Sequence, residues 1–115
     1  MAKHTAPIQA SVARTASYTG ADNVACSVNK LREGTISLNV TAVSGTDCSG
    51  SVVVQDYVGG AWHDLVTFNA ATAVSKQVAR NVTSFGTKMR ALLTLTGTGD
   101  LSFTYSVYGV FDRAI

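Results

Sequence analysis

The stretch LSFTYSV (residues 101–107) decides the fold class of this chain. Large apolar side chains stand at every second position, and serine or threonine separates them. A strand turns successive side chains to opposite faces of its sheet, so this alternation predicts a β-strand with one dry and one wet face. The same alternation recurs in residues 35–42 and 89–95, with turn-forming residues in between.

Alternating stretches and turn signals together predict the architecture. Strands at roughly ten-residue spacing, with no helical period, indicate an all-β fold: an antiparallel β-sandwich, jelly-roll-like, with about seven to eight strands. The segments SGTDCSG (44–50) and TGTGD (96–100) are predicted to be turns between strands. The predicted core consists of the alternating sets Ile36/Leu38/Val40, Val52/Val54, Met89/Ala91/Leu93/Leu95 and Leu101/Phe103/Tyr105/Val107.

The length of 115 residues predicts one domain. Residues 1–9 show no alternation, so we expect an N-terminal arm there and a single β-sandwich domain over residues 10–115. The N-terminus has no apolar run of signal-peptide length, and no segment is apolar over the roughly 18 residues that a membrane span needs. We therefore expect synthesis in a cytoplasm and no contact with a membrane.

Composition narrows the class of protein. Hydrophobic residues make up 46% of the chain and charged residues only 14%, which argues against disorder. The net charge of +2 is too small for binding nucleic acid by phosphate neutralisation. A surface rich in serine and threonine suits a protein that lies against partner proteins.

No residues form a recognisable catalytic, cofactor or metal site. His4 and His63 are the only histidines, and Glu33 is the only glutamate. His63 is followed directly by Asp64, but neighbours in a strand point to opposite faces. There is no nucleophile elbow, no phosphate-binding glycine loop and no Cys/His spacing typical of zinc. We expect a protein that is not an enzyme and needs no cofactor.

Cys26 and Cys48 are the only cysteines and allow two interpretations. In a reducing compartment they are two small, partly buried thiols. A disulfide between them, formed after release from the cell, would add roughly 3 kcal/mol by closing the loop between them.

Two surface features also allow two interpretations each. Trp62, with Tyr57 across a predicted hairpin, is either an aromatic platform for a sugar or a residue of the core or its rim. Lys76 and Arg80 share one strand face, as do Lys88 and Arg90 on the next strand. If these strands pair, the four form a basic patch for an acidic protein surface; otherwise they are solvated outer faces.

The order of several motifs resembles a group of small structural proteins of tailed bacteriophages. The resemblance covers roughly residues 13–111. It rests on ARTASYT, LNVTAVSGT, WHDLVTFNAAT and LTGTGDLSFTYSVYGV. It implies a β-sandwich on the virion, either a capsid decoration (cement) protein or a related head or tail accessory protein, and it implies no catalytic residue. Cys48, and the short hairpin YVGGAW (57–62), depart from the group's pattern, which puts loop contacts in doubt.

The resemblance sets the functional expectation. We expect a decoration protein that is made in the host cytoplasm and lies on the virion. It would stabilise the lattice of the major capsid protein, or bind another virion protein. We also expect a homo-oligomer, with a trimer as the first expectation. Lys3, His4 and Pro7 of the arm are the candidate anchoring residues. The alternative is a carbohydrate- or receptor-binding module of a tail or fibre. A cluster of Tyr57, Trp62 and His63 on one exposed face would favour it.

Overall fold

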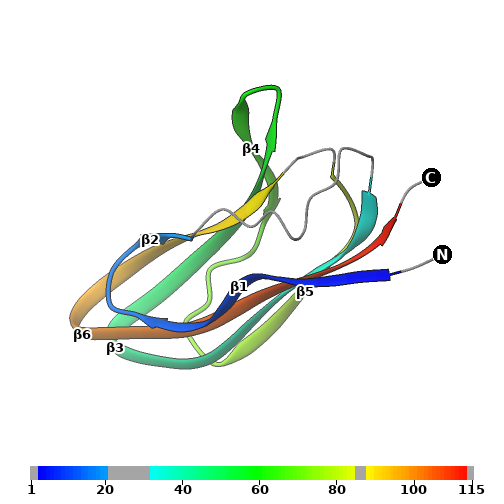
Figure 1. The fold of residues 1–115 in the computed structure, drawn as a ribbon. Helices are drawn as coiled ribbons and strands as arrows, with labels where there is room; N and C mark the ends of the chain where they lie inside the picture. The colour runs from blue at the N-terminus through cyan, green and yellow to red at the C-terminus, as the bar shows by residue number, and fades with distance from the viewer. Residues whose placement is uncertain (1–2, 21–31, 85–87, 114–115) are drawn as a thin grey trace.

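The computed structural model describes residues 3–20, 32–84 and 88–113, and within these ranges the chain is built from antiparallel strands. Their bounds are β1 Lys3–Arg14, β2 Tyr18–Thr19, β3 Arg32–Val58, β4 Ala61–Thr67, β5 Ser75–Ser84 and β6 Met89–Arg113. Figure 1 shows them as two layers that are joined where β3 and β6 bend. The predicted all-β sandwich is confirmed.

The two longest strands form one bent ribbon. β3 has 27 residues and β6 has 25, and they pair from Arg32↔Arg113 to Asp56↔Met89. Register shifts interrupt the pairing around residues 44–49, where Gly45 of β3 has φ 113° and Gly97 of β6 has φ 133°. These angles favour glycine because a Cβ would be strained there. The predicted turns at 44–50 and 96–100 are therefore bends within two continuous strands, and they fold the ribbon onto itself.

The pairing order is that of a jelly roll. One layer contains β1, residues 103–112 of β6, residues 32–44 of β3, and β5. The second layer contains β2, residues 89–96 of β6, residues 49–58 of β3, and β4. When the arms of β3 and β6 are counted separately along the described chain, the layers read 1-8-3-6 and 2-7-4-5. This is the order produced by rolling up one long antiparallel hairpin, and it confirms the jelly-roll-like prediction.

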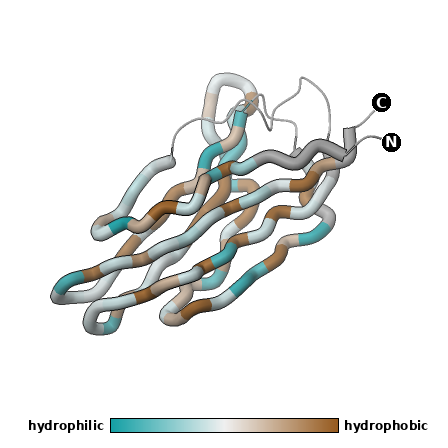
Figure 2. The backbone as a smooth tube through the Cα atoms, turned by 60° about the horizontal axis from the view of Figure 1, so that its bottom comes forward, coloured by the Kyte–Doolittle hydropathy of each residue, from teal (hydrophilic) through white to brown (hydrophobic). Residues whose placement is uncertain are grey.

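The core lies between the two layers and matches the alternation in the sequence. Figure 2 shows the alternation of apolar and polar residues along the strands. All members of the predicted core sets are buried except Leu101, which is partly buried and packs against the core. The largest side chains in the core are Tyr105, Phe103 and Phe111. Fully burying an aliphatic or aromatic side chain of this kind contributes roughly 1.5–3 kcal/mol, so these faces hold the layers together.

The start of the chain differs from the prediction of a separate arm. Residues 3–9 belong to β1, which pairs with β6 from Lys3↔Asp112 onward, and Ile8 is 3% exposed within the core. Pro7 is tolerated because β1 is an edge strand, where a missing N–H costs little, and the register of β1 with β6 shifts directly after it. Residues 3–9 therefore pair within the sandwich, although we expected an arm there.

Candidate functional site

The four basic residues of the predicted patch lie on two different layers. Lys76 and Arg80 are exposed on β5, at the edge of the first layer. Lys88 directly precedes β6 and Arg90 is the second residue of β6, in the second layer. β5 pairs with β3 and not with β6 in the described chain, because successive strands of a jelly roll cross from one layer to the other. A single four-residue basic patch is therefore not formed.

Lys88 and Arg90 instead meet Tyr57 and Trp62, and we call these four residues the aromatic–cation cluster. Tyr57 and Trp62 face each other across the β3–β4 hairpin, with ring centroids 5.2 Å apart in an edge-to-face arrangement. The Lys88 Nζ lies 4.6 Å from the centroid of the Tyr57 ring, and the guanidinium carbon of Arg90 lies 4.1 Å from that of Trp62. Such cation–π contacts contribute about 0.5–2 kcal/mol each, depending on desolvation.

A row of hydrogen bonds runs beside the cluster. The Arg90 Nε donates to Gln55 Oε1 at 3.0 Å, and Gln55 Nε2 donates to Asp64 Oδ1 at 2.8 Å. Direct cross-strand register brings these three residues side by side on β6, β3 and β4. Asp64 thus holds the Arg90 side chain in place through Gln55.

His63 does not join the cluster, although it lies between Trp62 and Asp64 in sequence. Its side chain is on the opposite face of β4, with Nε2 3.3 Å from the Val58 carbonyl oxygen. The structure therefore brings together Tyr57 and Trp62 but not the predicted third member. Because cations cover one face of each ring, the cluster presents fixed positive charge rather than a bare platform for stacking.

The hairpin that carries Tyr57 and Trp62 stands out from the sandwich, at the top of Figure 1. Gly59 and Gly60 form its turn with φ of 62° and 82°, the two positive values of a type I′ turn. This turn matches the right-handed twist of the strands and fixes the register that places Tyr57 opposite Trp62.

A second surface feature is the outer side of the first layer, where apolar side chains are exposed. Pro7, Tyr108 and Val78 lie in one cross-strand row with Ser37, and Val110 lies in the next row. Tyr108 is 42% exposed, Val78 43% and Val110 36%. We call Pro7, Tyr108, Val110 and Val78 the Tyr108 face. Val78 and Val82 are four positions apart on β5, but a register shift opposite Gly34 and Ile36 lies between them, so Val82 is buried while Val78 points outward.

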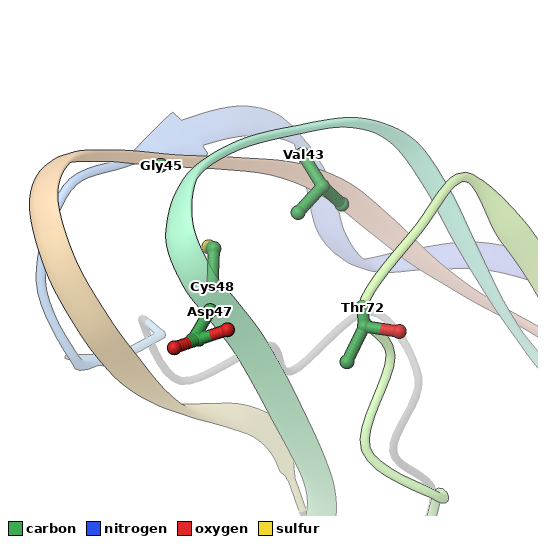
Figure 3. Close-up of a pocket in the computed structure, with 5 residues that line it drawn as sticks. All are labelled: Val43, Gly45, Asp47, Cys48 and Thr72. Carbon is green, nitrogen blue, oxygen red and sulfur yellow. The ribbon is translucent and has the colours of Figure 1, made fainter.

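A pocket of ≈ 380 Å³ lies beside the bend of the long strands (Figure 3). It is lined by Val43, Gly45, Asp47, Cys48 and Thr72. Cys48 is buried with its Sγ 3.9 Å from the Ser102 carbonyl oxygen, and the lining has no imidazole that could act as a base toward it. Cys26 lies outside the described residues, so the disulfide stays a prediction.

A buried phenol marks the corner where β1 leads into β2. Tyr105 is fully buried, and its hydroxyl has no hydrogen-bond partner within the described residues. Burial raises the pKa of Tyr105 to about 12, while nearby Arg14 lowers it and Tyr18 raises it slightly. The Arg14 guanidinium itself stacks 3.4 Å from the Tyr18 ring centroid. These contacts tie the corner together and offer no reactive group.

Metal-ligating side chains do not gather anywhere in residues 3–20, 32–84 and 88–113 in a group of three or more. The same ranges contain no helix that is long and apolar enough to cross a membrane. The backbones of Lys3 and His4, two of the candidate anchoring residues, pair with Asp112 and Phe111 of β6.

Solved structures include chains that are similar in fold to this one. The chain matches no protein-family model and no curated protein. It is similar to a chain in a structure of infectious bursal disease virus, Gx strain, with a TM-score of 0.47 and 14% sequence identity. The similarity covers 96% of this chain and 32% of the viral chain, so this chain spans about a third of the length of that one.

Proposed function

We propose that this chain is a non-enzymatic structural protein of a virion, a capsid decoration (cement) protein that binds the lattice of the major capsid protein. The observation that carries the proposal is the Tyr108 face. A lone domain gains nothing from leaving Tyr108, Val78 and Val110 exposed together on neighbouring strands. Such a face is suited to burial against a flat protein surface.

Two further observations support adhesion as the mechanism. The jelly-roll order of the layers is one that viral capsid domains use, although lectins and cupins use it as well. The motif resemblance to phage structural proteins points to the same class. A modest contact per copy is enough on a capsid, because symmetry repeats it and a homo-oligomer, with a trimer as the first expectation, multiplies it.

The test is attachment to the virion whose genome encodes the chain. Electron microscopy of the intact particle should locate this domain on the capsid exterior with the Tyr108 face toward the shell. Tyr108→Lys should leave folding unchanged because the side chain is exposed, yet lower the number of copies per particle. Val74→Lys is the matched control, since Val74 is 67% exposed and lies on the β4–β5 connection, outside the face. Equal occupancy of the two variants contradicts the proposal.

The aromatic–cation cluster favours a second candidate, a carbohydrate- or receptor-binding module of a tail or fibre. Trp62 and Tyr57 supply apolar ring area, and Lys88 and Arg90 supply positive charge beside it. This combination suits acidic sugars, whose carboxylate would meet Arg90 while the ring carbons meet Trp62. Binding of the isolated protein to acidic glycans on an array, lost in Trp62→Ala, would support this candidate over capsid decoration.

A further inference from the structure

Among the described residues, no strand covers the outer edge of β5. β5 runs over ten residues, and in the described chain it pairs on one side only, with β3. An edge strand presents unpaired N–H and C=O groups at every second residue along its free side. The bend of the β3–β6 ribbon does not reach β5, and β5 is irregular only between Ala79 and Val82, so residues 75–79 form a regular edge that can accept main-chain hydrogen bonds.

Side-chain contacts already hold this edge in place. Gln77 makes two hydrogen bonds with the backbone of Asn69: the Asn69 N–H donates to Gln77 Oε1 at 2.9 Å, and Gln77 Nε2 donates to the Asn69 carbonyl at 2.8 Å. They tie the middle of β5 to the β4–β5 connection on the inner side. An edge that is ordered in advance binds a partner with less entropic cost.

The side chains of β5 select the charge of the partner. Lys76, Val78 and Arg80 are exposed together on the outer face, and the strand SKQVARNVTS contains no acidic residue. Pairing of two β5 copies about Val78 would place Lys76 directly opposite Arg80 of the second copy, and like charges in that position repel. The edge is thus disfavoured for self-association and complementary to acidic side chains.

We propose that the edge of β5 takes up an extended acidic segment of a partner protein by strand addition. The segment carries an apolar residue opposite Val78 and an acidic residue two positions away on each side, opposite Lys76 and Arg80. Either strand direction satisfies this pattern because it is symmetric about its centre. The inference deepens the proposed function. It rests on that function in one respect only, namely that the partner is a virion protein.

The test uses the full-length protein and a short blocked peptide with a central valine, a glutamate two positions to each side and threonine elsewhere. Binding is followed by amide chemical shifts and hydrogen exchange, which report each residue of β5 separately. We expect shifts and added protection concentrated in residues 75–84. We expect weaker binding at high salt. A peptide with lysine in place of both glutamates should bind about tenfold less tightly.

Charge reversal in the protein makes the test sharper. Arg80→Glu should weaken binding of the glutamate peptide about tenfold and improve binding of the lysine peptide. The double variant Thr67→Glu/Thr94→Glu changes the net charge by the same amount at exposed positions of the second layer, and should leave both affinities nearly unchanged. Circular dichroism confirms that both variants fold.

Three results would overturn the inference: β5 amides already protected on both sides in the free protein, peptide shifts centred elsewhere, or equal effects of Arg80→Glu and the Thr67→Glu/Thr94→Glu control. These results are independent of particle attachment. A protein that is found on virions with unchanged occupancy in Arg80→Glu retains its proposed function and loses this inference. A protein that binds the peptide through β5 but is absent from virions retains the inference and loses the proposed function.

Discussion

The contact between Phe103 and Gly50 gives the most direct test of how the ribbon folds onto itself. Phe103 lies in the first layer and is fully buried, and Gly50 lies in the second layer. A Cβ built on Gly50 would stand 2.4 Å from the Phe103 ring, so the ring rests on the bare glycine backbone. Phe103→Ala removes this aromatic contact and should cost about 3–5 kcal/mol of unfolding free energy, or on the order of 15 °C in Tm.

A matched change at Gly50 measures the coupling free energy between Gly50 and Phe103. Gly50→Ala alone overpacks the contact and should cost about 1–3 kcal/mol. In the Phe103→Ala background the added methyl enters space that the ring has left. The double variant should then be at least about 1 kcal/mol more stable than the sum of the single costs predicts. Urea unfolding of the four proteins, with similar m-values, measures this coupling.

The control is Tyr108→Ala, which truncates an aromatic residue of the same strand that is 42% exposed, and it should cost much less than Phe103→Ala. A cost below about 1 kcal/mol for Phe103→Ala would mean that the ring is not part of the core. Additive costs at Phe103 and Gly50 would mean that the two layers do not meet at this point.

Deletion of residues 2–8 should lower Tm, because β1 loses its pairing with β6 together with Ile8; an unchanged Tm would restore the picture of a free arm. An absorbance titration of the folded protein should contain a tyrosine step near pH 12 that Tyr105→Phe removes. The pKa of Tyr105 is higher in the folded protein than the unfolded value of 10.0, so the folded state holds the phenol proton more tightly. The contribution of Tyr105 to the unfolding free energy is therefore fully present below pH 10 and is lost as the pH rises toward 12. Gly59→Ala should cost roughly 1 kcal/mol in thermal unfolding although no atom lies within 4 Å of the added Cβ, since the cost comes from the positive φ alone.

Strand identity and the main core could be predicted from the sequence, because the side-chain period of a strand is a local property. In LSFTYSV each apolar position from Phe103 to Val107 is buried as the alternation predicts. The same parity placed Lys76 with Arg80 on one face of one strand. The local pattern was less informative for residues 3–9. Ile8 is the large apolar side chain of this segment that is buried in the core, and a single buried position gives no alternation. The segment is a strand because its backbone pairs with β6.

The tertiary structure alone decided which strands share a layer. SGTDCSG and TGTGD carry glycines with positive φ, and glycine serves equally at a turn that ends a strand and at a bend that continues it. The difference lies in whether a partner strand keeps the hydrogen-bond ladder going, and for β3 that partner is β6, far along the chain. The same non-local pairing separates Lys76 and Arg80 from Lys88 and Arg90, and brings the latter two onto Tyr57 and Trp62. Alternation determines which face of a strand is buried, but only the pairing of distant strands determines which exposed side chains become neighbours.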